Sequence, residues 1–365
     1  MILFRYLSTE LWKNFVITLL SLTSLLLFTR FIGLLVSLTE ENLGVKDYLR
    51  LITYFLPLLL SYALPLAALM ASLFLFMRLV QDKELLALES LGLSFEKLLR
   101  PVFLFSIITL IITYFITLSF IPWSKHAYRT FLFELTKRKI ENGIPAKTFV
   151  PITNGLTMFV KKSWEKGKNF AIVFILDETQ KGQKGLIFAK KGWFTLKDDI
   201  LELHLDKGSV HLISKDYSSV QEIEFQKYVY RTRLKELKAT RTPSRGEMSL
   251  KELKEKTISL PPNDPKRAKY ITEYYRRLAF PWAAFFLPIL GAYLGSMIKT
   301  SGRVTGGVVA VILYLGYYFL QSLGISLAET QKLSPLMASN IPNIFLILVL
   351  TLLFWATKKR LIRPY

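Results

Sequence analysis

VFLFSIITLIITYFITLSFIP, residues 102–122, is an unbroken apolar run, and charged residues begin with Lys125, three positions beyond its end. A bilayer core about 30 Å thick needs about 20 apolar residues of helix, so this run is long enough to cross a membrane. Five more such runs occur, at residues 15–37, 51–77, 278–298, 306–326 and 337–356. The sequence therefore predicts a membrane α-helical protein in which six spans are split three and three by a polar insert.

The insert, residues 123–277, has the period-two pattern of strands instead of a helical pattern. In ILELHLD, residues 200–206, leucine alternates with polar residues; Lys207-Gly208 then predicts a turn, and the alternation resumes at residues 210–212. Short runs about 8–12 residues apart are typical of an all-β sandwich, jellyroll or open barrel. The expected domains are a membrane half at 1–122, a β domain with helical flanks at 123–277 and a second membrane half at 278–365.

Two helical flanks are expected beside the strands. Residues 124–142 extend the third span. Residues 249–256 form an amphipathic helix that Ser249 and Glu252 cap at its start.

The positive charge orients the chain in the membrane. Twelve Lys and Arg residues fall on one side of the six spans and three on the other, Lys46, Arg50 and Lys332. The positive-inside rule therefore predicts cytoplasmic termini and an external insert. The charged lead at residues 5–13 is expected to lie along the cytoplasmic membrane surface.

The net charge of +21 does not indicate nucleic-acid binding, because no basic and aromatic stripe accompanies it. The basic insert, with 32 Lys and Arg against 18 Asp and Glu, favours an anionic partner or simply a solvated surface.

Several kinds of chemistry have no motif here. The chain has no cysteine and no G-x-x-x-x-G-K-[ST] phosphate loop. Its three histidines, His126, His204 and His211, are scattered and form no metal-binding spacing. We expect no catalytic residues, no metal site and no cofactor, so energy for any transport work must come from a partner or an ion gradient. Carboxylates of the kind used by ion-driven transporters are absent from the six runs, which disfavours that class.

Arg30 is the clear ionisable residue within the spans, about 22 Å along the helix from Phe15. A charge at that depth costs a few kcal/mol and is a functional hypothesis by default. Its guanidinium suits an anionic phosphate, while snorkelling to the outer head groups is the competing explanation. Arg276 and Arg277 lie where the fourth span enters from outside, in the same leaflet as Arg30, and they are interpreted as interface anchors that could also meet lipid phosphates.

The loop at residues 78–100, RLVQDKELLALESLGLSFEKLLR, predicts a short amphipathic helix on the cytoplasmic side. Glu84, Leu85 and Leu88 lie within it, and Gly92 is a stop signal. Such a helix could lie flat against a cytoplasmic partner. An ordinary surface helix between two spans is the alternative.

Together with the three-plus-three layout, this loop resembles the LptF/LptG permease family over nearly the whole chain. Five features carry the resemblance. They are the opening ILFRYL at residues 2–7, Glu84 followed by Gly92, EMSLKEL at 247–253, EYYRRLAFP at 273–281 and NIPN at 340–343. Each motif is weak alone, and their order makes the set specific. One departure is Gly33, where the family has a second basic residue one turn after Arg30.

The resemblance implies a function and a set of partners. It implies a permease subunit of the ABC transporter that extracts lipopolysaccharide from the bacterial inner membrane, with LptF slightly preferred over LptG. The implied partners are a cytoplasmic ABC ATPase dimer docking at Glu84, Leu85, Leu88 and Gly92, a second six-span permease subunit and a periplasmic β-jellyroll protein. Arg30, with Arg276 and Arg277, is expected to approach lipid phosphates.

Two rival functions remain at this point. The first is a permease for another lipid or lipoprotein, which the co-purifying lipid would reveal. The second is a membrane-anchored lipid-binding scaffold without transport, which would have no ATPase partner.

Overall fold

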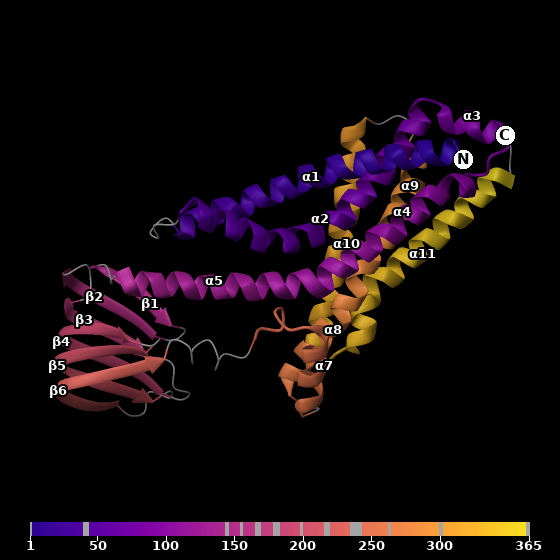
Figure 1. The fold of residues 1–365 in the computed structure, drawn as a ribbon. Helices are drawn as coiled ribbons and strands as arrows, with labels where there is room; N and C mark the ends of the chain where they lie inside the picture. Colours follow the sequence, from indigo (N-terminus) through magenta and orange to yellow (C-terminus); the bar gives the residue numbers. More distant parts are fainter. Residues whose placement is uncertain are drawn as a thin grey trace. The chain divides into compact units, whose positions relative to one another are not determined.

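The computed structural model describes residues 2–38, 44–142, 146–153, 156–164, 169–177, 183–197, 200–214, 220–233, 243–261, 264–298 and 302–362 (Figure 1). The chain divides into two compact units. The first, the membrane unit, comprises Met1–Tyr128 and Pro243–Tyr365, and the second, the β domain, comprises Arg129–Thr242. The expected boundaries at 122 and 277 therefore shift, because the segment after residue 243 packs with the membrane helices.

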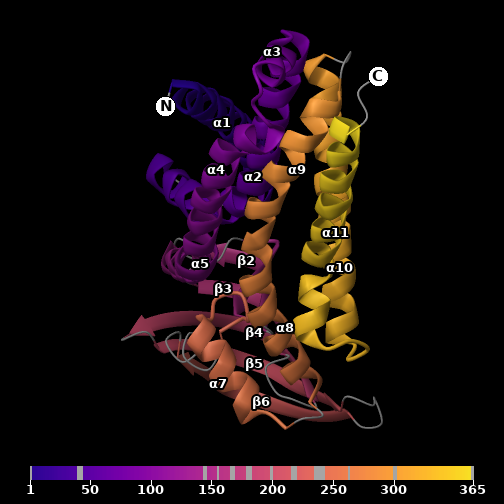
Figure 2. The same ribbon diagram turned by 90° about the vertical axis from the view of Figure 1, so that its right-hand side faces the viewer.

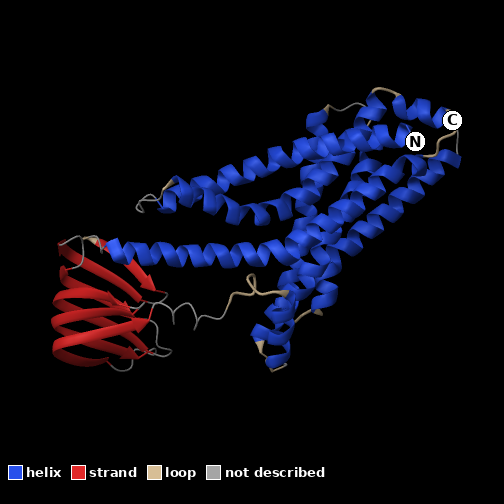
Figure 3. Ribbon diagram, viewed as in Figure 1, coloured by secondary structure: helices blue, strands red, loops and turns tan. Residues whose placement is uncertain are grey.

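Six helical stretches of the described chain are long and apolar enough to cross a membrane, as predicted. Figure 3 draws the helices in blue and the strands of the β domain in red. The helices are α1 (Ile2–Leu38), α2 (Val45–Gln81), α3 (Glu84–Ser90), α4 (Phe95–Phe115), the π-helix η1 (Ile116–Phe120), α5 (Ile121–Asn142), α7 (Leu250–Ser259), α8 (Pro265–Ala279), the 3-10 helix η2 (Phe280–Trp282), α9 (Ala283–Met297), α10 (Arg303–Glu329) and α11 (Pro335–Ile362). They extend beyond the apolar runs because polar residues continue the same helices at both ends.

Helix α2 forms the centre of the membrane unit and packs closely on α9. Small residues make this approach possible. A Cβ added to Gly291 would lie 2.5 Å from the Leu69 carbonyl oxygen, and one added to Gly295 would lie 2.5 Å from that of Leu73. The Ser72 hydroxyl also donates to the Pro288 carbonyl oxygen at 2.6 Å. Close backbone contact and polar bridging of this kind hold helices together where lipid supplies no hydrophobic driving force.

The charged lead at residues 5–13 is not a separate surface helix. It continues into the first span as part of α1, and Leu7 and Leu11 are buried in the core that α1 shares with α2 and α4. Trp12 also meets Phe105 of α4 edge-on, with ring centroids 5.0 Å apart. The expected position along the membrane surface is therefore corrected, because the apolar face of the lead is covered by protein.

The inserted β domain is confirmed, and its described strands form one antiparallel sheet in sequential order. They are β1 (Thr148–Thr153), β2 (Leu156–Trp164), β3 (Asn169–Asp177), β4 (Gln183–Lys197), β5 (Ile200–Ser214) and β6 (Val220–Arg233). One face carries the apolar core, which includes Met158, Phe170, Ile175 and Leu205. The predicted strand runs at residues 200–206 and 210–212 are parts of one long strand, β5.

A crease crosses the sheet where a turn was expected. Cross-strand pairing skips one residue in each of five neighbouring strands, at Lys161, Ile172, Lys190, Lys207 and Gln226. In β3 the buried residues jump from Phe170 to Val173, so the apolar side stays on the same face across the crease. Lys207-Gly208 is thus a bend within β5, and a Cβ at Gly208 would overlap the Phe188 carbonyl oxygen. Because of this bend, the parts of the sheet on either side of the crease contribute residues to the same apolar core.

Ile172 stores backbone strain at this crease. Its φ is 56°, a left-handed conformation that is costly for a β-branched residue, and its side chain is exposed. We expect Ile172→Gly to raise the free energy of unfolding of the β domain by about 0.5–1 kcal/mol. Thermal unfolding of the full chain, followed by hydrogen exchange of the strand amides, measures the change.

The matched control is Ile223→Gly, which removes an equally exposed isoleucine from β6 at a residue without positive φ. This change should lower stability, because glycine weakens an ordinary strand. Equal losses in both variants would contradict the strain at Ile172.

The predicted helix at 249–256 is confirmed as α7. The Ser249 backbone N–H donates to Glu252 Oε2 at 2.6 Å, and the Glu252 N–H donates to Ser249 Oγ at 3.3 Å. The bond from the Ser249 N–H to its carboxylate lowers the pKa of Glu252. The next helix, α8, begins at Pro265 with Asp264 as its cap. The predicted extension of the third span is also confirmed, since α5 follows α4 and η1 without a break.

Candidate functional site

The predicted helix in the loop at 78–100 exists as α3, at one end of the membrane unit. Figures 1 and 2 show α3 at the same end as the N-terminus and the last turns of α11. Lys83 starts the helix with a φ of 57°, and Gly92 follows its end with a φ of 81°, as a helix stop requires. Leu85 is buried and Leu88 half-buried, whereas Leu86 and Leu91 are 67% and 78% exposed. The predicted docking role of Leu85 is corrected, because Leu85 packs into the core of the membrane unit, and the outward apolar edge is formed by Leu86 and Leu91.

Glu84 lies at the centre of a polar cluster that joins three helices. The Tyr6 hydroxyl of α1 donates to Glu84 Oε2 at 3.0 Å, and the Arg78 guanidinium of α2 lies 3.8 Å from Glu84 Oε1. Arg78 also pairs with Glu10 at 2.9 Å and donates to the Tyr6 hydroxyl. The cluster ties the start of α3 to the ends of α1 and α2.

Arg30 is exposed on α1, as the snorkelling and phosphate-binding hypotheses both require. The next residue, Phe31, meets Tyr48 of α2 with ring centroids 5.8 Å apart, which places this part of α1 beside the start of α2. Tyr62, the α2 residue that lines the pocket described below, is about 21 Å further along that helix. The structure therefore does not bring Arg30 together with Arg276.

Arg277 is not at the surface, so its predicted role as an interface anchor that meets lipid phosphates is corrected. Its side chain is 1% exposed, and all its hydrogen bonds are internal. Nε donates to Glu273 Oε1 at 2.9 Å, Nη1 to the Met248 carbonyl oxygen at 2.6 Å and Nη2 to the Arg245 carbonyl oxygen at 2.8 Å. The segment that begins at residue 243 covers Arg277, and Arg277 holds that segment in place.

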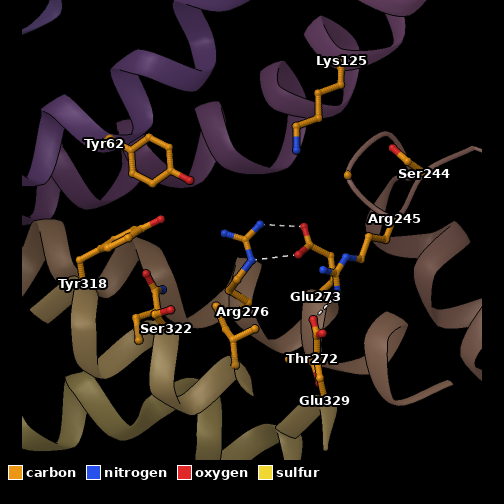
Figure 4. A pocket seen from close by; sticks show the side chains of 13 residues that line it. Tyr62, Lys125, Ser244, Arg245, Thr272, Glu273, Arg276, Tyr318, Ser322 and Glu329 are labelled. Atoms are coloured by element: carbon orange, nitrogen blue, oxygen red, sulfur yellow. Dashed lines mark hydrogen bonds and ion pairs between the residues drawn. The ribbon is translucent and has the colours of Figure 1, made fainter. Parts of the chain in front are cut away.

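Arg276 instead faces a pocket of about 430 Å³ within the membrane unit. Figure 4 shows it between Glu273 and the rings of Tyr62 and Tyr318. Its Nε and Nη2 donate to the two Glu273 oxygens at 2.9 and 2.8 Å, which is a bidentate pair. The residues around this pair come from α2, α5, α8, α10 and the segment at 243–249, so the pocket exists only in the folded chain.

Sequence reasoning missed most of the pocket. Lys125 lies just beyond the third apolar run, and Gln321 is a lone amide inside the fifth. Gln321 was a usable signal, because an amide within a membrane span needs a partner. Tyr6 and Arg78 were likewise missed beside Glu84. Their partnership joins residues 72 positions apart, which no local pattern reveals.

The fold and these sites define a multi-pass membrane protein with six spans, an inserted β domain and polar clusters at both ends of its membrane unit. A sequence model of the family "Lipopolysaccharide export system permease LptF/LptG" matches residues 5–356. The chain therefore belongs to the LptF/LptG family of lipopolysaccharide export permeases.

Individual relatives are distant but extend along the chain. The lipopolysaccharide export system permease protein LptF of Escherichia coli (strain K12) is 22% identical over 98% of this chain and 96% of its own length. LptF of Shigella flexneri matches equally well. An uncharacterized protein of Rickettsia prowazekii, RP871, is 24% identical over 80% of this chain and 81% of its own.

Proposed function

We propose that this chain is an LptF-like permease subunit that extracts lipopolysaccharide from the outer leaflet of the bacterial inner membrane, powered by a separate cytoplasmic ABC ATPase. The observation that carries the proposal is the family match across both membrane halves and the β domain. The absence of a phosphate-loop motif from the sequence agrees with ATP hydrolysis by a partner.

The arrangement of helices in the membrane unit supports an orientation with cytoplasmic termini and an external β domain. The N-terminus, α3 and the end of α11 lie at one end of this unit, and α7 and α8 lie at the other (Figure 2). The end with α3 carries the basic loops that the positive-inside rule assigns to the cytoplasm. The opposite end then faces the periplasm.

The exposed edge of α3 is the proposed docking surface for the ATPase dimer. Leu86 and Leu91 are large exposed apolar residues beside an acidic side chain, Glu84, which suits a groove in a partner. The cluster of Glu84 with Tyr6 and Arg78 would pass a movement of α3 to α1 and α2. In this proposal, a second six-span subunit completes the lipid cavity, and the apolar face of the β domain passes the lipid to a periplasmic β-jellyroll protein.

A pull-down tests the proposed complex directly. The full-length chain, purified in detergent from its native membrane, should retain an ABC ATPase, a second permease and lipopolysaccharide, all identifiable by mass spectrometry. Retention of a different lipid or a lipoprotein would indicate another exporter. Retention of lipid without any ATPase would support a scaffold and contradict the transport function.

Arg30 is the proposed lipid-phosphate contact on α1. We expect Arg30→Ala to lower photocrosslinking of lipopolysaccharide at this helix about tenfold, because a charge-assisted hydrogen bond to phosphate is lost. Crosslinking yield in the assembled complex measures the effect. Arg5→Ala, a loss of the same charge near the other end of α1, is the control and should leave the yield unchanged. An unchanged yield for Arg30→Ala would contradict the phosphate contact and leave snorkelling to the outer head groups as the explanation for Arg30.

A further inference from the structure

The pocket around Arg276 contains hydrogen-bond donors that the described protein does not satisfy. The Gln321 side chain is 3% exposed, and its Nε2 has no acceptor among the described residues. The Lys125 ammonium forms no hydrogen bond or ion pair within that part of the chain, although it is half-buried and points into the pocket (Figure 4). The bidentate pair with Glu273 uses Nε and Nη2 of Arg276, which leaves Nη1 as a third donor. Of these three donors Gln321 Nε2 is the buried one, and a buried donor without an acceptor is costly and needs an explanation.

The charges around the pocket favour an anionic occupant. The cations Lys125, Arg245 and Arg276 line the pocket together with the carboxylates of Glu273 and Glu329. Lys125 also interacts electrostatically with Arg277 and Glu247, which do not line it. Each carboxylate already has a partner. Glu273 accepts from two guanidiniums, Glu329 pairs with Arg245, and Glu247 accepts from the Ser244 hydroxyl at 2.7 Å. Together these groups carry one net positive charge, and the Lys125 ammonium is the cation among them that forms no direct ion pair within the described residues.

A purely structural role explains these residues less well. Glu273 and Glu247 interact electrostatically with Lys125, but Lys125 forms an ion pair with neither of them. Its Nζ would lie 2.5 Å from a Cβ added at Gly246. A glycine there lets the ammonium sit against the backbone of the segment at 243–249. None of these carboxylates accepts a hydrogen bond from Gln321, because its buried Nε2 has no partner among the described residues. Both side chains are positioned to bind something else.

We propose that this pocket is a phosphate-binding site in which Lys125 and Gln321 bind the ligand directly. A phosphate offers three strong acceptor oxygens, which match the donors Lys125 Nζ, Gln321 Nε2 and Arg276 Nη1. Lysine serves as a point charge for such groups. Where the phosphate belongs to a lipopolysaccharide, the inference rests on the proposed function; a free phosphate would use the same donors. The site is built within one subunit and does not include Arg30.

The binding test uses the full-length chain in dodecyl maltoside, a detergent without phosphate. The probes are lipid A with both phosphates, the same lipid after dephosphorylation, and inorganic phosphate, with binding measured by native mass spectrometry. We expect Lys125→Met to weaken binding of phosphorylated lipid A about tenfold or more, and Lys125→Arg to retain it. Lys269→Met removes the same charge from an exposed position on α8 and should bind like the wild type.

Gln321→Leu separates a binding role from a structural one. It should weaken binding of phosphorylated lipid A about fivefold, since a neutral hydrogen bond is lost. The melting temperature without ligand should stay level or rise, because a buried amide without a partner is replaced by an apolar side chain. A lower melting temperature with unchanged affinity would overturn the binding role of Gln321.

The probes also keep this site separate from the proposed function. If lipid A binds and Lys125→Met has no more effect than Lys269→Met, the phosphate site is wrong and the lipid function stands. If lipid A fails to bind but inorganic phosphate binds and needs Lys125, the site stands without that function. Equal binding of phosphorylated and dephosphorylated lipid A would also overturn the site.

Discussion

Glu273→Leu is expected to destabilise the membrane unit by about 3–5 kcal/mol, because it leaves the buried guanidinium of Arg277 without its carboxylate. The Arg277 side chain is 1% exposed and that of Glu273 is 8% exposed, so the pair is largely shielded from bulk water. The carbonyl oxygens of Met248 and Arg245 still accept from Arg277, but they carry no full charge. Thermal unfolding in detergent measures the loss. Limited proteolysis should also show faster cleavage after residue 243.

The double variant Glu273→Leu with Arg277→Leu provides the control. Removing both charges abolishes the uncompensated cation, so the double variant should be more stable than Glu273→Leu alone. Arg277→Leu alone should have an intermediate effect, since Glu273 keeps its bidentate bonds to Arg276 while two carbonyl oxygens lose a donor. Simple addition of the two single effects would show that the pair is not coupled and would contradict this account.

Glu84→Lys is expected to remove the ATPase from the purified complex and to lower lipid-stimulated ATP hydrolysis more than tenfold. The substitution places a second cation beside Arg78, whose guanidinium lies 3.8 Å from Glu84 in the native cluster. It also removes the carboxylate that accepts from Tyr6. Like charges at that spacing should push the start of α3 away from α1 and α2. Co-purification and hydrolysis rates measure both consequences.

Two control variants define what Glu84 does. Glu89→Lys makes the same charge change on the same helix, away from Arg78, and should keep the ATPase bound. Glu84→Gln retains an acceptor for Tyr6 and loses only the charge, so an intermediate result would divide the effect between the hydrogen bond and the ion pair. Normal co-purification and normal stimulation in Glu84→Lys would rule out the coupling role.

Local patterns predicted those parts of the fold that depend on neighbours in the chain. The six spans follow from apolar length, since a bilayer demands about 20 such residues whatever the tertiary contacts. The start of α7 follows from Ser249 and Glu252, three residues apart, and the end of α3 from Gly92. The signals at the start of α7 and the end of α3 act within one or two helical turns, and an apolar run acts within a single helix.

The sheet shows where local patterns mislead. Lys207-Gly208 has the composition of a turn, yet β5 continues through it as a crease. In β5 the crease combines a left-handed residue, Lys207, with a glycine, and the same pair is also typical of a chain reversal. Only pairing with β4 and β6 on either side of Gly208 decides between them, and those partners are defined by the whole sheet.

The sequence by itself determined the class of this protein: six spans, an inserted β domain, a short helix at Glu84 and membership of a permease family. The tertiary structure alone decided which charges are available. Arg276 and Arg277 are adjacent in the chain, yet one lines a pocket and the other is enclosed by the segment at 243–249. Lys125 and Gln321, almost two hundred residues apart, line that same pocket. Burial and pairing depend on long-range packing, so no local pattern could assign them.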